Sequence, residues 1–367
     1  MVAMTSSPVN ILDFTPDQLR EYVKLLGEPA YRADQILQCV YRDYATDFEQ
    51  MTVLNQALRQ KLAEHARLIT LEPLEERTSA DGQTRKLLFR LEDGKTIESA
   101  LMTSTDTRTG RERHTVCVSS QVGCPIGCPF CATGQQGFER NLSPGEIIEQ
   151  VLYFVRRFRG NASEQEKGTT PRWLTNVVFM GMGEPLANYD NTKQAIAMLN
   201  SPKGLGLGTH QISLSTSGLV PQILKLTEED LQYQLAISLH AANDELRNRL
   251  VPINKKYPLE QLIAACKEYG NKTGRNTFIE YALFDKINDS IKDADNLIKL
   301  LHGLQCSINL IPGNLSSSSF KPSSREAALA FQKKLIASGI RTMLRVSRGA
   351  DIEAGCGQLR SRWTGPC

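Results

Sequence analysis

A chain of 367 residues with a net charge of +3 and 41% hydrophobic residues is long and apolar enough to bury a substantial core. The charge is too small to establish a nucleic-acid partner, although local basic patches leave one open. No stretch approaches the roughly 18 apolar residues of a membrane-spanning helix, and the N-terminus lacks a secretion signal, so no membrane association is expected. Nine cysteines in such a chain indicate reduced thiols, used for metal or redox chemistry, in the cytoplasm.

Residues 1–102 are predicted to form a small α+β accessory domain. Thr15 as N-cap, Pro16 at the first helical position and Gln18 closing a capping box predict the start of its first helix. Its other expected elements are helices near Ala30–Val40 and Leu54–His65, tight turns at Asp81-Gly82 and Asp93-Gly94, and strands near Lys86–Leu91 and Thr96–Met102.

Strands and helices alternate from Thr115 onward, which predicts a parallel sheet with helices outside, either open or curled into a barrel. Functional groups then belong on loops that follow the C-terminal ends of the strands. The expected strands are Thr115–Ser119, Asn176–Met180, Gln211–Ser215, Leu235–Leu239, Phe278–Leu283 and Ser307–Ile311, and the expected helices are Glu146–Arg157, Asn191–Leu199, Leu259–Tyr269 and Ile291–Leu301.

Three cysteines, Cys124, Cys128 and Cys131, stand within eight residues just after the first of these strands. Three thiolates on a short loop suit an iron–sulfur cluster, whose irons are normally held by cysteine sulfur. A cluster of four irons would keep one iron open, as catalytic metal sites keep an open position. A structural zinc site completed by Cys117 or His114, or three unrelated core cysteines, are the alternatives.

Polar residues follow several of the other expected strands. Glu184, in Gly181–Pro185, could accept a hydrogen bond from an ammonium group, and the glycines beside it could let a ligand approach the backbone. Hydroxyl groups in Ser213–Gly218 and Ser238–His240 could bind ribose or carboxylate groups. A tight turn and satisfied strand ends are the alternatives, and Asn309 and Asn314 could be simple turn residues.

The remaining candidates have ordinary interpretations when each is taken alone. Cys117 and Cys356 would be packed or bystander thiols, although the glycines flanking Cys356 suggest an accessible loop. Glu98, on a hairpin strand, would be a solvent-facing carboxylate. Arginines near the first strand and the C-terminus form either solvated faces or phosphate contacts, and they are Arg108, Arg111, Arg113, Arg341, Arg345, Arg348, Arg360 and Arg362.

The spacing of the three cysteines resembles the signature of radical S-adenosylmethionine (SAM) enzymes. Together with other segments in order, it resembles one family of them, the dual-specificity 23S rRNA/tRNA adenine-C2 methyltransferases. The segments that carry the resemblance are Cys117–Cys124 (CVSSQVGC), the cysteine run, Ala132–Asn141 (ATGQQGFERN), Gly181–Pro185, Leu214–Gly218 and Arg348–Leu359 (RGADIEAGCGQL).

The resemblance implies an incomplete (β/α)6 barrel in residues 103–349, an N-terminal accessory domain that contacts RNA in residues 1–102, and a C-terminal segment in residues 350–367. Cys124, Cys128 and Cys131 would hold a 4Fe–4S cluster whose open iron binds SAM. Cys356 would be the cysteine that becomes S-methylated, Cys117 its resolving partner and Glu98 the proton acceptor. The implied SAM contacts are Gly183, Glu184, Ser215, Ser238, Leu239, His240 and Asn314.

In the family's ping-pong scheme, one SAM methylates Cys356 and a second yields a 5′-deoxyadenosyl radical that activates the S-methyl group. The resulting carbon radical adds to C2 of adenine, and a transient disulfide between Cys117 and Cys356 forms as the product leaves. The implied partners are 23S rRNA, tRNA, a low-potential electron donor and a disulfide reductant, and the enzyme would be a cytoplasmic monomer. Two rival hypotheses remain: methylation at C8 by a related resistance-type enzyme, and a non-enzymatic iron–sulfur or zinc RNA-binding protein.

Overall fold

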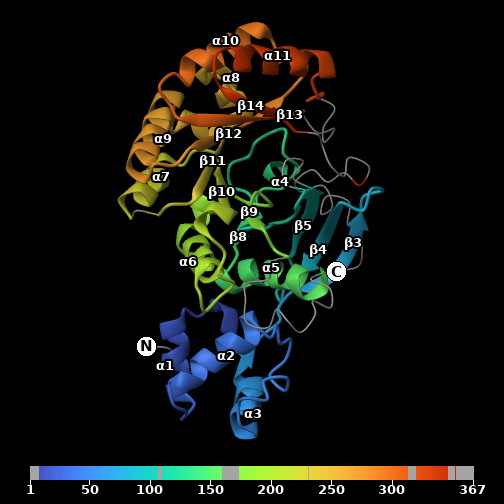
Figure 1. Ribbon diagram of the computed structural model, residues 1–367, viewed down its shortest axis with the longest axis vertical. Helices are drawn as coiled ribbons and strands as arrows, with labels where there is room; N and C mark the ends of the chain where they lie inside the picture. Colours follow the sequence, from blue (N-terminus) through green and yellow to red (C-terminus); the bar gives the residue numbers. More distant parts are fainter. Residues whose placement is uncertain are drawn as a thin grey trace.

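The computed structural model describes residues 8–105, 110–158, 173–229, 231–312, 320–345 and 352. Within them, one sheet of ten strands runs through the molecule in the order β14-β13-β12-β11-β10-β9-β6-β5-β4-β3 (Figure 1). The strands are β3 (Glu72–Thr78), β4 (Thr84–Arg90), β5 (Thr96–Thr105), β6 (Glu112–Cys117), β9 (Asn176–Phe179), β10 (Ile212–Thr216), β11 (Gln234–Ser238), β12 (Thr277–Leu283), β13 (Cys306–Pro312) and β14 (Arg341–Leu344).

Within this sheet, neighbouring strands are parallel all the way along the series β6, β9, β10, β11, β12, β13 and β14, and helices connect most of them. This arrangement confirms the predicted partial barrel, and β14 extends it by a strand that the sequence analysis did not predict. The helices are α5 (Pro144–Phe158), α6 (Tyr189–Asn200), α7 (Val220–Glu228), α8 (Asp244–Leu250), α9 (Leu259–Thr273), α10 (Ile291–Leu300) and α11 (Arg325–Ala337). Of the helices in the described ranges, none is long and apolar enough to cross a membrane.

The parallel sheet has one apolar and one polar face, because successive side chains of a strand point to opposite sides. Val116, Val177, Ile212 and their neighbours on the later strands are at most 1% exposed, and they pack in one core with the helices. Strand register places the opposite set on one shared face, which we call the polar face: Cys117, Ser215, Ser238, Glu280 and Asn309.

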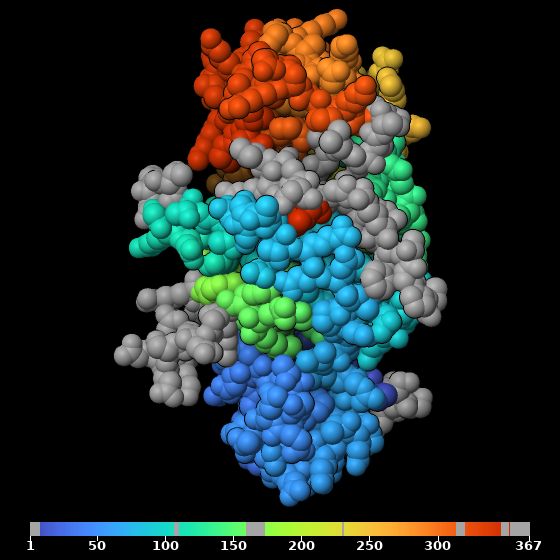
Figure 2. All heavy atoms as spheres, turned by 90° about the vertical axis from the view of Figure 1, so that its right-hand side faces the viewer, coloured from blue at the N-terminus to red at the C-terminus, as the bar shows by residue number. Residues whose placement is uncertain are grey.

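The N-terminal helices form a separate layer at one end of the molecule, opposite α10 and α11 (Figures 1 and 2). They are α1 (Pro16–Leu25), α2 (Tyr31–Tyr41) and α3 (Gln56–His65), and the predicted capping box of Thr15 and Gln18 is present at the start of α1. Asp13 ties this layer to the barrel: its carboxylate accepts from the Gly145 backbone and its carbonyl from Gln194. Burial raises the pKa of the Asp13 carboxyl group.

The hairpin strands β3, β4 and β5 belong to the same sheet as the barrel. β5 pairs antiparallel with β6 from Ala100 opposite Cys117 to Thr105 opposite Glu112. The boundary predicted after residue 102 therefore falls inside a strand, and the hydrogen-bonded ladder continues across it. The division into an accessory domain, a barrel and a C-terminal segment stays a prediction.

Candidate active site

The cysteine loop is closed at its base by a small two-stranded sheet, β7 (Gln121–Gly123) with β8 (Phe138–Asn141). The Cys124 backbone N–H donates to the Gly137 carbonyl at 2.8 Å. A side chain cannot replace the hydrogen of Gly123, because its φ is +75° and a Cβ there would lie 1.9 Å from the Gly137 oxygen. These contacts hold Cys124–Gly137 as one compact loop, which includes the short helix α4 (Ala132–Gln135).

The three thiols of this loop lie near enough to repel one another when ionised. Burial, with the charges of Glu184 and Cys131 acting in the same direction, raises the pKa of Cys124 to about 12. Burial also raises the pKa of Cys128, with Cys131 and Cys124 acting in the same direction. Thiols buried in this way ionise readily only beside a cation, and bound metal deprotonates a coordinating thiol.

The spacing of the thiols bears on which metal group they fit. Among the described residues, no group of three or more cysteine, histidine or acidic side chains closes around a single metal-ion position. Three cysteine thiolates on one loop are the usual donors of an iron–sulfur cluster, so the donor set fits such a cluster. His114, the proposed fourth zinc ligand, instead stacks on Trp173 and lies 3.4 Å from Glu112.

Phe130 fastens the cysteine loop to the strand ends. Its ring packs edge-on against His240 at a centroid distance of 5.1 Å and against Phe284 at 5.2 Å. Cys124, Cys128 and Phe130 also pack against a small buried cluster that includes Leu250 and Val251. The loop is therefore positioned by the segments after β11 and β12.

Glu184 is buried in the loop after β9, at 3% exposure. Its Oε2 accepts from the backbone N–H and the hydroxyl of Ser217, both at 2.7 Å, and its Oε1 accepts from the Leu186 N–H. The Thr216 side chain also bonds to this carboxylate, so the protein holds it on several sides, and its negative charge is what it offers to a ligand such as an ammonium group. Burial raises the pKa of Glu184, although these hydrogen bonds act in the opposite direction.

The glycines beside Glu184 admit protein backbone, where the sequence analysis expected a ligand. A Cβ on Gly181 would lie 2.7 Å from the Val118 carbonyl oxygen, and one on Gly183 would lie 2.6 Å from the Gln121 Cβ. Gly183 also has a φ of +102°. The two glycines therefore let the loop after β9 pack directly on the segment between β6 and β7.

Ser215, Ser238 and His240 gather at the ends of β10 and β11. The hydroxyls of Ser215 and Ser238 are 3.4 Å apart on the polar face. The His240 Nδ1 accepts from the Ala282 N–H at 3.0 Å, so the ring proton is on Nε2. Burial, reinforced by the Arg247 guanidinium, lowers the pKa of His240 to about 3, which leaves a neutral donor at physiological pH.

Arg247 is a central residue of the site that the sequence analysis missed. Its side chain is fully buried, and its guanidinium donates to the carbonyls of Leu239, Ser217 and Ser238 and to the Asn254 side chain. It thus joins the ends of β10 and β11 to α8. Within the charged segment Asp244–Leu250 it looked like any solvated helix residue, and no local signal marked it.

Glu98 and Cys117 occupy neighbouring strands on the polar face. Glu98 is 4% exposed and its Oε2 lies 3.3 Å from the Lys86 Nζ, so its interpretation as a solvent-facing carboxylate is wrong. Cys117 ends β6 opposite Ala100, two residues from Glu98, and its carbonyl accepts from the Ser99 hydroxyl at 2.6 Å. The Glu98 carbonyl accepts from Ser119, whose hydroxyl oxygen in turn accepts from the Met182 N–H, so this strand is tied to the loop that carries Glu184.

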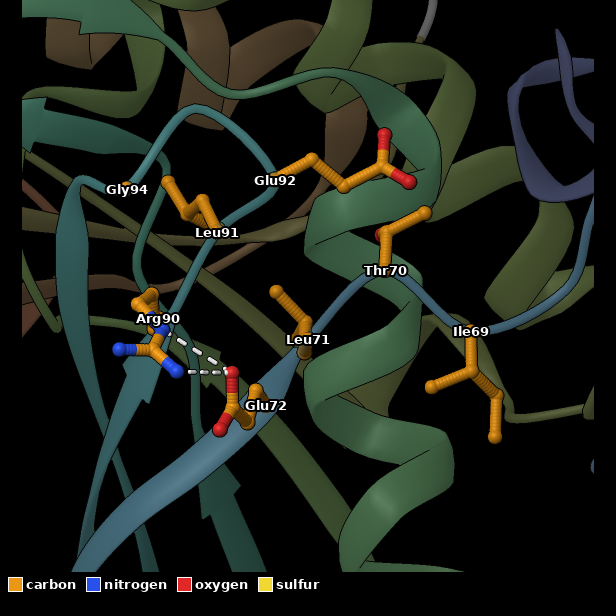
Figure 3. A pocket seen from close by; sticks show the side chains of 8 residues that line it. All are labelled: Ile69, Thr70, Leu71, Glu72, Arg90, Leu91, Glu92 and Gly94. Atoms are coloured by element: carbon orange, nitrogen blue, oxygen red, sulfur yellow. Dashed lines mark hydrogen bonds and ion pairs between the residues drawn. The ribbon is translucent and has the colours of Figure 1, made fainter. Parts of the chain in front are cut away.

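Several predicted residues lie outside the described residues: Asn314, Cys356, Arg108, Arg348, Arg360 and Arg362. Of the described arginines, Arg113 donates to Asn176, whereas Arg345 lies 4.0 Å from Glu280. A surface cavity of about 380 Å³ lies beside the turn between β4 and β5, where Arg90 is paired with Glu72 (Figure 3). None of the predicted site residues lines it; the lining residues are Ile69, Thr70, Leu71, Glu72, Arg90, Leu91, Glu92 and Gly94.

A parallel partial barrel with a three-cysteine loop after its first strand defines a radical SAM enzyme, and residues 118–298 match the family model of the Radical SAM superfamily. Residues 9–68 match the model described as Ribosomal RNA large subunit methyltransferase N-terminal domain. A crystal structure of a radical SAM methyltransferase from Sphaerobacter thermophilus superposes with a TM-score of 0.88 at 46% identity, covering 96% of this chain and 99% of that chain.

Two curated relatives extend the match over nearly the whole chain. The probable dual-specificity RNA methyltransferase RlmN of Dictyoglomus turgidum is 44% identical over 353 residues, covering 96% of this chain and 97% of that protein. The dual-specificity RNA methyltransferase RlmN of Alcanivorax borkumensis is 44% identical over 355 residues, covering 96% and 90%. The chain belongs to the RlmN family of RNA methyltransferases. It is a SAM-dependent radical enzyme whose cofactors are a 4Fe–4S cluster and SAM.

Proposed function

We propose that this enzyme methylates C2 of an adenine in 23S rRNA and of the adenine next to the tRNA anticodon, through an S-methylcysteine at Cys356. The observation that carries the proposal is that Glu98 and Cys117 lie on neighbouring strands of the polar face, with the cysteine loop following in the chain after Cys117. A carboxylate, a resolving thiol and a cluster loop are the parts that this chemistry requires. The matched ribosomal RNA methyltransferase N-terminal domain and the dual-specificity relatives support both RNA substrates.

Cys124, Cys128 and Cys131 hold the cluster in this proposal, and the cluster supplies the electron that starts radical chemistry on SAM. The buried charge of Glu184 faces the ammonium group of SAM in this proposal, and Glu184 lies close enough to the cysteine loop to raise the pKa of both Cys124 and Cys128. The backbone of Gly183, the hydroxyls of Ser215 and Ser238, the backbone of Leu239, the Nε2–H of His240 and the side chain of Asn314 make the other contacts.

The chain's own residues carry the methyl group and release the product. The thiolate of Cys356 attacks the methyl carbon of SAM, and S-adenosylhomocysteine leaves, as in covalent catalysis generally. After this carbon is joined to C2 of the adenine, Glu98 takes the C2 proton. The Cys117 thiolate then attacks the Cys356 sulfur, and a disulfide forms as the carbon–sulfur bond to the product breaks. The released carbon keeps the electron pair of that bond and takes up one proton to complete the methyl group. Two electrons from an external reductant restore both thiols.

The remaining features of the proposal follow from this chemistry. A thiol pair that must be reduced in every cycle suits the cytoplasm, where reductants keep cysteines as thiols. A low-potential donor must supply the single electron to the cluster. We assign the active unit as a monomer.

The test is anaerobic reconstitution with SAM and reductant, followed by nucleoside mass spectrometry of added 23S rRNA and tRNA. The expected product is 2-methyladenosine from both RNAs. Cys356→Ala should abolish it, whereas Cys117→Ser should trap RNA covalently on the protein. 8-Methyladenosine would favour the resistance-type reaction, and neither product from protein with a complete cluster would exclude both reactions. Glu326→Gln, on an exposed helix end, is the matched control.

A further inference from the structure

Two acceptor atoms are buried on the polar face without hydrogen-bond donors among the described residues. They are Oε2 of Glu280 on β12 and Oδ1 of Asn309 on β13. The other polar atom of each side chain is paired, since the Asn309 Nδ2 donates a hydrogen bond to the Glu280 Oε1 at 2.7 Å. Glu280 is only 5% exposed.

Leaving such atoms unpaired is costly. A buried acceptor without a donor costs about 1–3 kcal/mol, and more when it is charged. Burial raises the pKa of Glu280, although Asn309 and the Arg345 guanidinium act in the opposite direction. Two such acceptors side by side indicate a place where a ligand supplies the donors.

The pair lies in line with the proposed SAM contacts. Register sets Ser238 directly beside Glu280, and Glu280 directly beside Asn309, on three adjacent strands. The hydroxyl oxygen of Ser238 in turn lies 3.4 Å from that of Ser215. Glu184 follows β9, three strands before β12, which is roughly 14 Å along the sheet at the usual strand spacing.

The surroundings select the kind of donor. The Arg345 Nη1 is 4.0 Å from the Glu280 Oε2, too far for a hydrogen bond but near enough to disfavour a second cation. An ammonium group therefore fits Glu184 better than it fits this pair. Neutral O–H or N–H donors are what remain, and the nucleoside half of SAM carries both kinds, in its ribose hydroxyls and its adenine amine.

We propose that Glu280 and Asn309 form a subsite that binds the nucleoside half of SAM, by accepting hydrogen bonds from its ribose hydroxyls or its adenine amine. This inference rests on the proposed SAM site and extends it across two further strands. It assigns the carboxylate after β9 to the amino-acid end of SAM and the carboxylate of β12 to the nucleoside end.

Glu280→Gln tests the subsite with little change of shape. The carbonyl oxygen of the new amide can still accept from Asn309, while its NH₂ group places donors where the open acceptor was. The loss of one hydrogen bond to a charged group corresponds to an increase in the SAM Kd of about 10- to 100-fold, measured by equilibrium dialysis on the reconstituted protein. Iron content and far-UV circular dichroism should match the wild type, and Glu326→Gln should leave the Kd unchanged.

Analogues of SAM identify which donor is bound. If a ribose hydroxyl is the donor, the wild-type protein should bind the 2′-deoxy or the 3′-deoxy analogue more weakly than SAM. If the adenine amine is the donor, the wild-type protein should bind the analogue that lacks this amine more weakly than SAM. Glu280→Gln should no longer distinguish that analogue from SAM, because the lost contact is the same one. If Glu280→Gln fails to fold, Asn309→Ser carries the same measurement, since it removes the second open acceptor.

Three results would overturn the inference. An unchanged SAM Kd in folded Glu280→Gln, in an enzyme that still forms 2-methyladenosine, would exclude the subsite and leave the proposed function intact. A weakened affinity for RNA with an unchanged SAM Kd would assign the pair to the substrate nucleoside instead. Absence of SAM binding by the wild type would overturn both proposals together.

Discussion

The Nζ of Lys86 lies 3.3 Å from the Oε2 of Glu98, and each side chain is only 4% exposed. The two residues come from adjacent hairpin strands, β4 and β5, and both point to the polar face. A buried ion pair is weak evidence for stability in itself, but removing one partner leaves an uncompensated charge. The pair therefore makes the position of the Glu98 side chain dependent on Lys86.

Lys86→Met should destabilise the protein by about 3–5 kcal/mol, because the Glu98 carboxylate loses the nearby ammonium group. Urea unfolding measures the change. Adding Glu98→Gln to Lys86→Met should recover part of the loss. The control is Lys193→Met, which breaks a half-exposed ion pair with Glu229 and should cost within about 1 kcal/mol. Equal losses in the two lysine variants would contradict the interpretation of the Lys86 pair.

Arg247→Lys should lower both stability and SAM affinity. A lysine cannot reproduce the fork that reaches the carbonyls of Ser217, Ser238 and Leu239, so the expected destabilisation is about 3 kcal/mol or more. Arg249→Lys on the same helix is the matched control, since Arg249 is exposed, and it should change stability by less than about 0.5 kcal/mol. Thermal unfolding and equilibrium dialysis with SAM check the two effects; normal SAM binding by Arg247→Lys would refute the positioning role.

Gly183→Ala should destabilise by about 3–5 kcal/mol, because strain at a φ of +102° adds to overlap with Gln121. Gly274→Ala measures the backbone strain alone. Gly274 has a φ of +67° and open space around its Cβ position, so its cost should be about 1–2 kcal/mol. The denaturant midpoints of the two variants measure the difference. Similar midpoints would show that a Cβ at position 183 does not overlap Gln121.

His240 should make stability fall as the pH falls from about 6.5. Its pKa is about 3 in the folded protein against about 6.5 in an unfolded chain, so the unfolded state binds more protons between these values. The slope should approach about 1.4 kcal/mol per pH unit below pH 6. His240→Asn, which tolerates the φ of +60°, should remove that slope between pH 7.5 and 5.5 in urea unfolding. An unchanged slope would show that other groups cause it.

Much of the fold was predictable because the βα units carry their own local signals. The capping box of Thr15 and Gln18 predicted the start of the first helix, and it is present. The strand β14 was missed because its four residues, Arg341–Leu344, show no apolar alternation and become a strand only by pairing with β13. Helix α8 was missed for a similar reason, since its charged sequence conceals one fully buried arginine.

Some residues of the site were predictable from the adjacent sequence, whereas others depend on contacts between distant segments. The cysteine loop is a contiguous segment, so its spacing alone predicted a metal-binding loop. The burial of Glu98 depends on Lys86 and on pairing of β5 with β6, and no pattern near Glu98 reports either contact. Glu280 looked like an ordinary strand residue and Asn309 like a simple turn residue, whereas Asn309 lies inside β13. Their open acceptors arise only when β12 and β13 lie side by side.

The ladder between β5 and β6 also governs how the protein can be divided for expression. A fragment ending at residue 102 would keep most of β5 but lose its partner β6, and its outer edge would present unpaired backbone groups. Exposed edges of this kind recruit other chains and cause aggregation. A soluble N-terminal fragment should therefore end before β3, near residue 70, which leaves the whole hairpin with the catalytic half.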